Sequence, residues 1–182
     1  MDRVCVVDFD ETLLTVDSTK YLVFRERLYL QLPILFWGLL FLLARAILPR
    51  SAQSGIRRRA KYLVLRALDK LGEEKIVEKY SKFFSKSLNF ELLKKIRERY
   101  KEVYIISAAW QAIIQGALAY AGVLDFKIFG TRYTENFGDF SICWHEAKAR
   151  QARELGLSGF DLYTDSYDDE PLMKLANKVT MV

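Results

Sequence analysis

Val-Cys-Val-Val-Asp-Phe-Asp-Glu-Thr, residues 4–12, is the stretch that decides the fold. It begins as a short β-branched run, which is typical of a buried strand in a parallel sheet. Asp8 and Asp10 follow where that strand ends, at the edge of the sheet where ligands bind, and their side chains share one side of an extended chain. Two such carboxylates repel each other unless a cation or a shared proton offsets the repulsion. The pattern therefore indicates either a Mg²⁺ site with one carboxylate free to attack, or a strand end with solvated aspartates.

Strand and helix patterns alternate along most of the chain. Gly122 and Gly156 mark helix ends, since glycine commonly follows the last helical turn. This alternation predicts an α/β fold with a doubly wound, Rossmann-like parallel sheet. A β-hairpin is expected within residues 129–142, around Gly138 and Asp139. The expected strands are Val4–Asp8, Val103–Ser107, Phe126–Thr131, Leu162–Asp165 and Val179–Val182, and the expected helices are Phe90–Tyr100, Trp110–Ala121, His145–Leu155 and Pro171–Ala176.

Residues 14–89 interrupt this alternation, because they contain helical patterns only. We therefore expect a core made of residues 1–13 and 90–182, with an inserted, all-helical cap made of residues 14–89. Such an insertion after the first strand is how a cap over a site would be built.

An apolar segment spans residues 28–48 of this cap, interrupted only by Gln31 and Arg45. A transmembrane helix needs about 20 residues, so the length is borderline. A single crossing is excluded, because the motifs before and after it must share one site. Two alternatives remain. Either a helix or hairpin dips into one leaflet, bent near Pro33 or Gly38, or a helix is buried in the cap core or in a dimer interface.

Basic residues crowd into residues 20–68, which hold ten Lys and Arg and one acid, Glu26. This segment has a net charge of +9, whereas the rest of the chain, with 18 basic and 22 acidic residues, is at −4. Such a segment indicates an anionic partner, which is a lipid headgroup, a phosphorylated substrate or nucleic acid. For an anionic membrane, residues 28–59 are the expected contact.

The remaining composition narrows the class of protein. A chain of 182 residues with 51% hydrophobic residues forms one domain, or a core with a small insertion. Cys5 lies in an expected core strand far from Cys143, so a free thiol and a reducing, cytoplasmic compartment are expected. The first strand also starts too early for a cleaved signal peptide to precede it. His145 is the one histidine, which excludes a multi-His metal site within one chain.

Three further motifs carry candidate site residues. Ser107 ends an expected strand, where its hydroxyl and nearby N–H groups suit a phosphate oxygen, or where it caps a helix. Lys148 lies early in a helix, either as a cation for phosphate or as a solvated side chain. Asp165 ends another expected strand and is followed by Asp168 and Asp169. These oxygens suit Mg²⁺, or else form an acidic loop that caps the next helix.

Taken in this order, the motifs resemble those of the haloacid dehalogenase superfamily of phosphohydrolases. The resemblance rests on residues 8–12, Ser107, Lys148 and residues 165–169, and it spans nearly the whole chain except the cap. The helical insertion, and the run Thr-Asp-Ser-x-x-Asp-x-Pro-Leu over residues 164–172, are similar to the phosphoserine-phosphatase-like branch with a helical C1 cap.

The resemblance implies a role for each motif residue. Asp8 would be the nucleophile that forms an aspartyl-phosphate, and Asp10 would protonate the leaving oxygen and then activate water. Ser107 and Lys148 would hold the phosphoryl group. Mg²⁺ would be bound by Asp8, the backbone carbonyl of Asp10, and Asp165.

Supporting roles are implied for Thr12 and Asp169. Asp168 ranks below Asp165 and Asp169, because this branch usually has an uncharged residue at its position. Glu11 stands where the family often has glycine, which would alter the turn but not the chemistry.

A weaker resemblance concerns the substrate. The apolar, Arg-rich cap and the run His145-Glu-Ala-Lys148 are similar to membrane-associated members of the superfamily that act on phosphatidylglycerophosphate. That resemblance implies a phosphatase of a lipid phosphate, peripheral on the cytoplasmic face of the inner membrane. The alternative is a soluble phosphatase of a small, phosphoserine-like metabolite. A basic module that binds nucleic acid would leave the motifs unexplained, so no nucleic-acid partner is expected.

Overall fold

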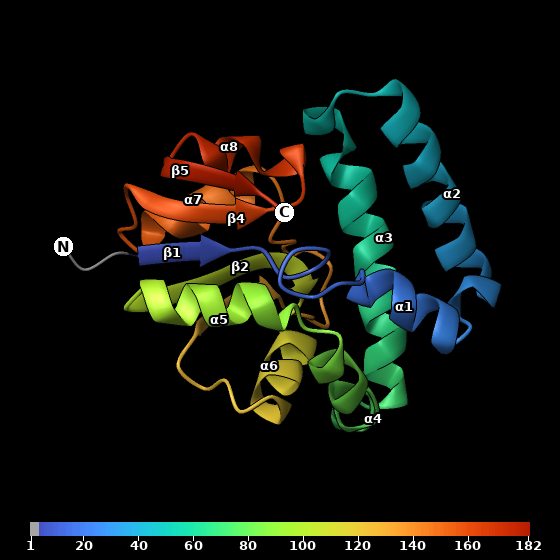
Figure 1. The fold of residues 1–182 in the computed structure, drawn as a ribbon. Helices are drawn as coiled ribbons and strands as arrows, with labels where there is room; N and C mark the ends of the chain where they lie inside the picture. The colour runs from blue at the N-terminus through green and yellow to red at the C-terminus, as the bar shows by residue number, and fades with distance from the viewer. Residues whose placement is uncertain (1–3) are drawn as a thin grey trace.

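Five parallel strands form one sheet at the centre of the computed structural model, which describes residues 4–182. Their order is β3-β2-β1-β4-β5, and each pair of neighbours is parallel (Figure 1). The predicted Rossmann-like α/β fold is confirmed. The strands are β1 (Val4–Val7), β2 (Glu102–Trp110), β3 (Lys127–Thr131), β4 (Phe160–Thr164) and β5 (Ala176–Met181).

Helices pack on both faces of this sheet. Cys5 and Val7 belong to one hydrophobic cluster with α4, α5 and α6, whereas Val6 belongs to another with α7 and α8. This split follows from the alternation of side chains along a strand. Cys5 is a buried free thiol, as expected. The helices are α1 (Ser18–Arg25), α2 (Leu32–Ile47), α3 (Arg50–Leu71), α4 (Glu73–Lys86), α5 (Phe90–Arg99), α6 (Gln111–Tyr120), α7 (Glu146–Glu154) and α8 (Glu170–Met173), with 3₁₀ turns at Leu28–Leu30 and Tyr167–Asp169.

The β-hairpin expected within residues 129–142 is wrong. Only β3 forms there, and residues 132–144 contain no strand. Arg58 of α3 supplies the physical reason, because its guanidinium donates to the carbonyl oxygens of Phe137 and Phe140, each at 2.6 Å, and of Gly138 at 3.0 Å. A side chain from a distant helix thus satisfies carbonyl groups that a second strand would have used.

Two chain segments join residues 14–89 to the sheet, and they run side by side. Asn89 N–H donates to the carbonyl of Leu13 at 2.8 Å, and Thr15 N–H donates to the carbonyl of Ser87 at 2.9 Å. The division into a core of residues 1–13 and 90–182 and a cap of residues 14–89 stays a proposal, which these paired segments support.

Helices α1, α2 and α3 lie beyond the carboxyl ends of the strands (Figure 1). Helix α4 packs instead along α6 of the core. At that contact a Cβ on Gly116 would lie 2.2 Å from Ser81 Oγ, so the two helices approach closely because residue 116 is glycine.

Helix α2 is continuous, so the alternative of a hairpin bent near Pro33 or Gly38 is wrong. Pro33 lies in the first turn, where a missing N–H costs nothing, and Gly38 lies inside the helix. Only Ile34 and Ala44 of α2 are buried, so a helix buried in the cap core is also wrong. Within residues 4–182, no helix combines the length and apolar character needed to cross a membrane.

Candidate active site

Lys148 is buried at the centre of the candidate site. Its Nζ lies 2.8 Å from Asp8 Oδ2 and 2.8 Å from Asp169 Oδ2, and only 2% of the side chain is exposed. Burial opposes the positive charge, but Asp169 and Asp8 outweigh it, so the pKa of Lys148 is raised. Thr164 Oγ1 donates to the same Asp169 oxygen at 2.7 Å. Lys148 is therefore an ion-paired cation and not a solvated helix residue.

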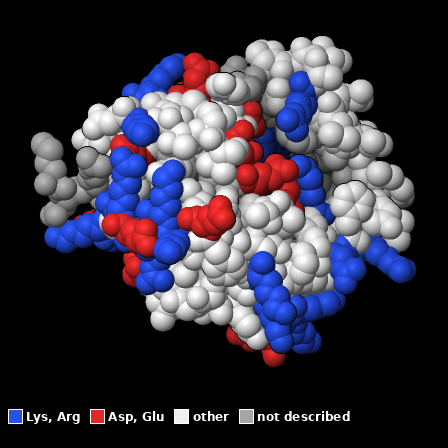
Figure 2. All heavy atoms as spheres, viewed as in Figure 1, with Lys and Arg blue, Asp and Glu red and all other residues white. Residues whose placement is uncertain are grey.

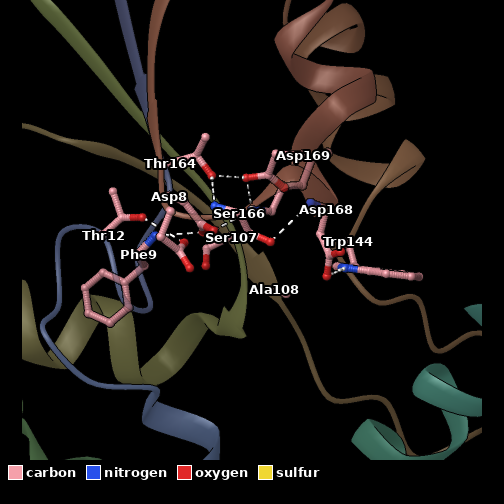
Figure 3. A network of polar contacts seen from close by, with 12 residues as sticks. Asp8, Phe9, Thr12, Ser107, Ala108, Trp144, Thr164, Ser166, Asp168 and Asp169 are labelled. Carbon is pink, nitrogen blue, oxygen red and sulfur yellow. Dashed lines mark hydrogen bonds and ion pairs between the residues drawn. The ribbon is translucent and has the colours of Figure 1, made fainter. Parts of the chain in front are cut away.

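Asp8 is held at the end of β1 by contacts on each side. Its backbone N–H donates to the carbonyl of Tyr163 on β4 at 3.0 Å, and Phe9 N–H donates to Asp8 Oδ1 at 2.7 Å. The other carboxylate oxygen faces Lys148, so the orientation of the group is fixed before any ligand arrives. Figure 3 shows Asp8 between Thr12, Ser107 and Thr164 at the end of the sheet.

Three more motif residues meet at this edge. Thr12 Oγ1 donates to Asp165 Oδ1 at 3.0 Å. Burial, and then the charge of Asp8, raises the pKa of Asp165, which means that the two carboxylates lie close enough to repel. Ser107 is buried on β2 and accepts from Ala109 N–H at 3.2 Å. It is not a helix cap, because α6 starts only after Trp110.

Asp10 lies two residues beyond Asp8, in the segment between β1 and α1. Its Oδ1 accepts from Ser18 N–H at 2.9 Å. Burial, reinforced by Asp17, raises the pKa of Asp10 to about 7, although Lys61 opposes this shift. A carboxyl group with this pKa can give and take a proton near neutral pH.

Lys61 of α3 is a buried lysine that faces this carboxyl group. Its Nζ donates to Thr19 Oγ1 at 2.5 Å. Burial lowers the pKa of Lys61 to about 8, and Asp10 partly offsets that effect. Each group therefore favours the charged form of the other: Lys61 lowers the pKa of Asp10, and Asp10 raises the pKa of Lys61.

The donor set fits Mg²⁺. The negative charge of Asp8 raises the pKa of Asp165, so the two carboxylates repel each other. A divalent cation bound to both would relieve this repulsion. Mg²⁺ is usually held by one or two carboxylates together with water and phosphate oxygens. Among residues 4–182, no three His, Cys, Asp or Glu side chains gather closely enough to form a metal cage. Asp8 and Asp165 match the one or two carboxylates that a Mg²⁺ site requires.

Sequence reasoning missed three residues near the site: Lys61, Arg57 and Trp144. Asp168, which ranked lowest among the acids, accepts from Arg57 Nη1 at 3.0 Å and from Trp144 Nε1 at 3.1 Å. Arg57 and Lys61 were visible only as members of the basic segment. Their spacing of four residues puts them on one helix face, but nothing in the sequence indicates that this face meets the sheet.

A cavity of about 440 Å³ opens between α1, α2 and α3 and reaches Asp10. Its wall along α2 is apolar, and its cations are side chains of all three helices. The lining includes Asp10, Asp17, Lys20, Leu35, Leu39, Leu42, Arg45, Arg57 and Lys61.

Comparisons with known proteins give a family and a fold. The model of the haloacid dehalogenase-like hydrolase family matches residues 5–174. No curated protein sequence matches the chain. A solved phosphoserine phosphohydrolase-like protein from Francisella tularensis subsp. tularensis SCHU S4 is 16% identical, covers 99% of this chain and 95% of its own, and has a TM-score of 0.56.

Two phosphoserine phosphatase structures are similar as well. One, described as a phospho-aspartyl intermediate analogue, is 19% identical over 99% of this chain and 86% of its own, with a TM-score of 0.61. The other, in apo form, is 18% identical over 98% and 85%, with a TM-score of 0.60. At these identities the likeness shows the fold.

Proposed function

Because the chain belongs to the haloacid dehalogenase-like hydrolase family, we propose that it hydrolyses phosphomonoesters with Mg²⁺ through an aspartyl-phosphate on Asp8. The observation that carries this proposal is the buried contact of Lys148 with both Asp8 and Asp169. Burying charged groups costs desolvation free energy, so a buried ion pair needs a reason. We infer that Lys148 is buried here because it takes part in the reaction.

In the first step, one oxygen of Asp8 attacks phosphorus and the bond to the alcohol oxygen breaks. Asp10, with its pKa raised to about 7, gives the departing oxygen a proton, because an alkoxide leaves poorly. Lys148 and the Ser107 hydroxyl hold the phosphoryl oxygens. Phosphoryl transfer needs mainly such positioning and charge neutralisation.

In the second step, Asp10 takes a proton from water, which attacks the aspartyl-phosphate and frees Asp8 and inorganic phosphate. Asp8, Asp165 and the Asp10 carbonyl would hold Mg²⁺, with Thr12 orienting Asp165 and Asp169 anchoring Lys148. When bound, the ion neutralises charge on the transferred group.

For the substrate, we propose a lipid phosphate such as phosphatidylglycerophosphate. The cavity supports this choice, because apolar side chains of α2 line it together with Asp10 and the cations Arg45 and Arg57. A lipid substrate also implies work at an anionic membrane surface, peripheral on the cytoplasmic face. The alternative, a small phosphoserine-like metabolite, is favoured by the fold shared with phosphoserine phosphatases.

The test is a screen of phosphomonoesters that includes phosphoserine and lipid phosphates in detergent, with and without Mg²⁺. We expect Asp8→Asn to lose at least about 10³-fold in turnover while it keeps the wild-type circular dichroism spectrum. Asp125→Asn is the matched control, since Asp125 is an exposed carboxylate away from the site. Full activity of Asp8→Asn would overturn the mechanism.

A further inference from the structure

Helix α2 exposes large apolar side chains along its whole length. Leu32 is 78% exposed, Phe36 and Leu43 are 61% exposed, and Ile47 is 77% exposed. Their spacing of four, seven and four residues places them on one side of the helix. Leu30 and Phe24, which precede α2, are also exposed, with exposed fractions of 66% and 68%. Large exposed apolar patches are rare on monomeric soluble proteins and usually mark a site that binds a protein or a membrane.

Exposed cations flank this surface in the sequence. Arg25 and Arg27 are exposed before α2, and Arg45 is exposed in its last turn. No Asp or Glu occurs between Glu26 and Asp69. In Figure 2 the region over α2, at the right of the molecule, is white with blue groups towards its lower end and no red on it. Exposed cations thus flank α2 at both ends, and Glu26, the acid between Arg25 and Arg27, is paired with Lys79.

From this arrangement we propose that α2 is an in-plane anchor that inserts its face of Leu32, Phe36, Leu43 and Ile47 into one leaflet of an anionic bilayer. A helix of 16 residues is about 24 Å long, too short to cross a hydrocarbon core of about 30 Å. Lying flat, the helix buries its apolar side, and the exposed Arg25 and Arg27 that precede it can meet the headgroups.

A second copy of this chain is a poorer occupant of the same face. Two copies that met through α2 would bring together two segments of residues 20–68, each with a net charge of +9. An anionic bilayer removes this repulsion, because its headgroups attract the cations of the same segment.

The position of the anchor connects it with the candidate site. Leu35, Leu39 and Leu42, on the neighbouring side of α2, line the cavity that reaches Asp10. A helix seated in a leaflet would therefore place the cavity beside the lipids, so that a lipid phosphate enters without crossing bulk water. This part of the inference rests on the proposed function, whereas the docking itself does not.

The test compares binding to vesicles of phosphatidylcholine with 30% phosphatidylglycerol and to vesicles of phosphatidylcholine alone. We expect wild type to sediment with the anionic vesicles, and the triple variant Leu32→Gln, Phe36→Gln and Leu43→Gln to bind at least about tenfold less. None of these three side chains lines the cavity, so turnover of soluble p-nitrophenyl phosphate should not change. The matched control replaces three exposed apolar residues of the core by Gln, namely Phe90, Tyr120 and Leu124.

Two further measurements separate this proposal from its alternatives. Asp8→Asn should keep full vesicle binding, so loss of catalysis and loss of docking are distinguishable. Brominated lipids should quench Trp37, the tryptophan of α2, because Trp110 and Trp144 are buried. Unchanged vesicle binding of the triple variant, absence of quenching, or a wild-type dimer that the triple variant converts to monomer would overturn the membrane assignment.

Discussion

Arg57 on α3 and Asp168 in the turn after β4 form an ion pair, with Nη1 and Oδ2 3.0 Å apart. The Arg57 guanidinium also lies 4.4 Å from the centre of the Trp144 ring, whose Nε1 donates to the same Asp168 oxygen. The turn that contains Asp168 also carries Asp165 and Asp169. One side chain therefore connects α3 with the turn that holds two candidate site residues.

Removing this ion pair should loosen the cap without removing any reacting group. We expect Arg57→Met to lower the free energy of unfolding by about 1–2 kcal/mol, since the two side chains are about three-quarters buried. The measurement is a double-mutant cycle with Asp168→Asn, for which we expect a coupling energy of about 1 kcal/mol. Lys94→Met is the control, because its pair with Glu98 is exposed and spans 3.9 Å. Additive effects of Arg57→Met and Asp168→Asn would contradict the contact.

The sequence could predict the candidate site residues at the carboxyl ends of the strands, but not the contacts that α3 makes with them. Asp8, Lys148 and Asp165 were predictable because each lies at a strand end or helix start, which a short local pattern marks. Ser107 was predicted at a strand end as well, but β2 continues past it to Trp110. The contact of Arg57 with Asp168 joins residues 111 positions apart. In the sequence alone, Arg57 and Asp168 cannot be distinguished from ordinary surface charges, because only the packing of α3 brings them together.

The hairpin prediction for residues 129–142 was wrong because tertiary contacts determine the backbone conformation there. Residues 129–142 carry turn residues at the right spacing for a hairpin, yet Arg58 takes up their carbonyl groups. The apolar segment was also recognised, but hydropathy alone cannot tell an exposed helix from a buried one. Its exposed face, with Leu32 at 78%, emerged only from the packed structure.

Mg²⁺ should stabilise the protein, since Asp8 and Asp165 repel each other. At about 100 times its dissociation constant, a ligand adds about 2.7 kcal/mol, which corresponds to a rise in Tm of about 5–10 °C for a chain of this size. Scanning fluorimetry should show this rise in wild type and in Asp168→Asn, whose carboxylate faces Arg57. Asp165→Asn should lose most of it. A shift that depends on Asp168 and not on Asp165 would place the ion in the turn instead.

Lys148→Met should be both inactive and unstable. The variant leaves Asp8 and Asp169 buried without their cation, and breaking a buried ion pair from one side costs about 3–5 kcal/mol. Turnover should fall at least about 10²-fold, because a fixed positive charge at the phosphoryl group is lost. Urea denaturation with Lys174→Met as control measures the stability, since Lys174 is 70% exposed in its pair with Glu170. A Lys148 variant as stable as that control would contradict the arrangement.

Glu11→Gly should stabilise the protein. Glu11 has a φ of +58°, which costs an L residue about 1–2 kcal/mol but costs glycine almost nothing. The greater freedom of glycine in the unfolded chain offsets part of this gain, so we expect about 0.5–1 kcal/mol in urea denaturation. Glu11→Ala removes the same exposed carboxylate, 3.8 Å from Lys20, but keeps the strain, and should give no increase. Equal effects of the two substitutions would show that the turn is not strained.

The proton role of Asp10 can be separated from its structural role by the choice of leaving group. An alkyl phosphate needs a proton on its departing oxygen, whereas p-nitrophenolate leaves without one, so Asp10→Asn should lower kcat/KM by about 10²–10⁴ for the first and far less for the second. The same assignment predicts a pH dependence. The pKa of Asp10 is raised to about 7, so the protonated acid is present below that pH and is lost above it. The ratio kcat/KM reports only the steps up to departure of the alcohol. For the alkyl ester, kcat/KM should therefore fall as the pH rises through about 7, whereas for p-nitrophenyl phosphate it should not change with pH. Asp17→Asn, which keeps Asp10 and removes the neighbouring charge that raises its pKa, should move that fall to lower pH. Equal losses for both esters in Asp10→Asn would assign Asp10 to holding the Ser18 N–H at the start of α1, and not to proton transfer.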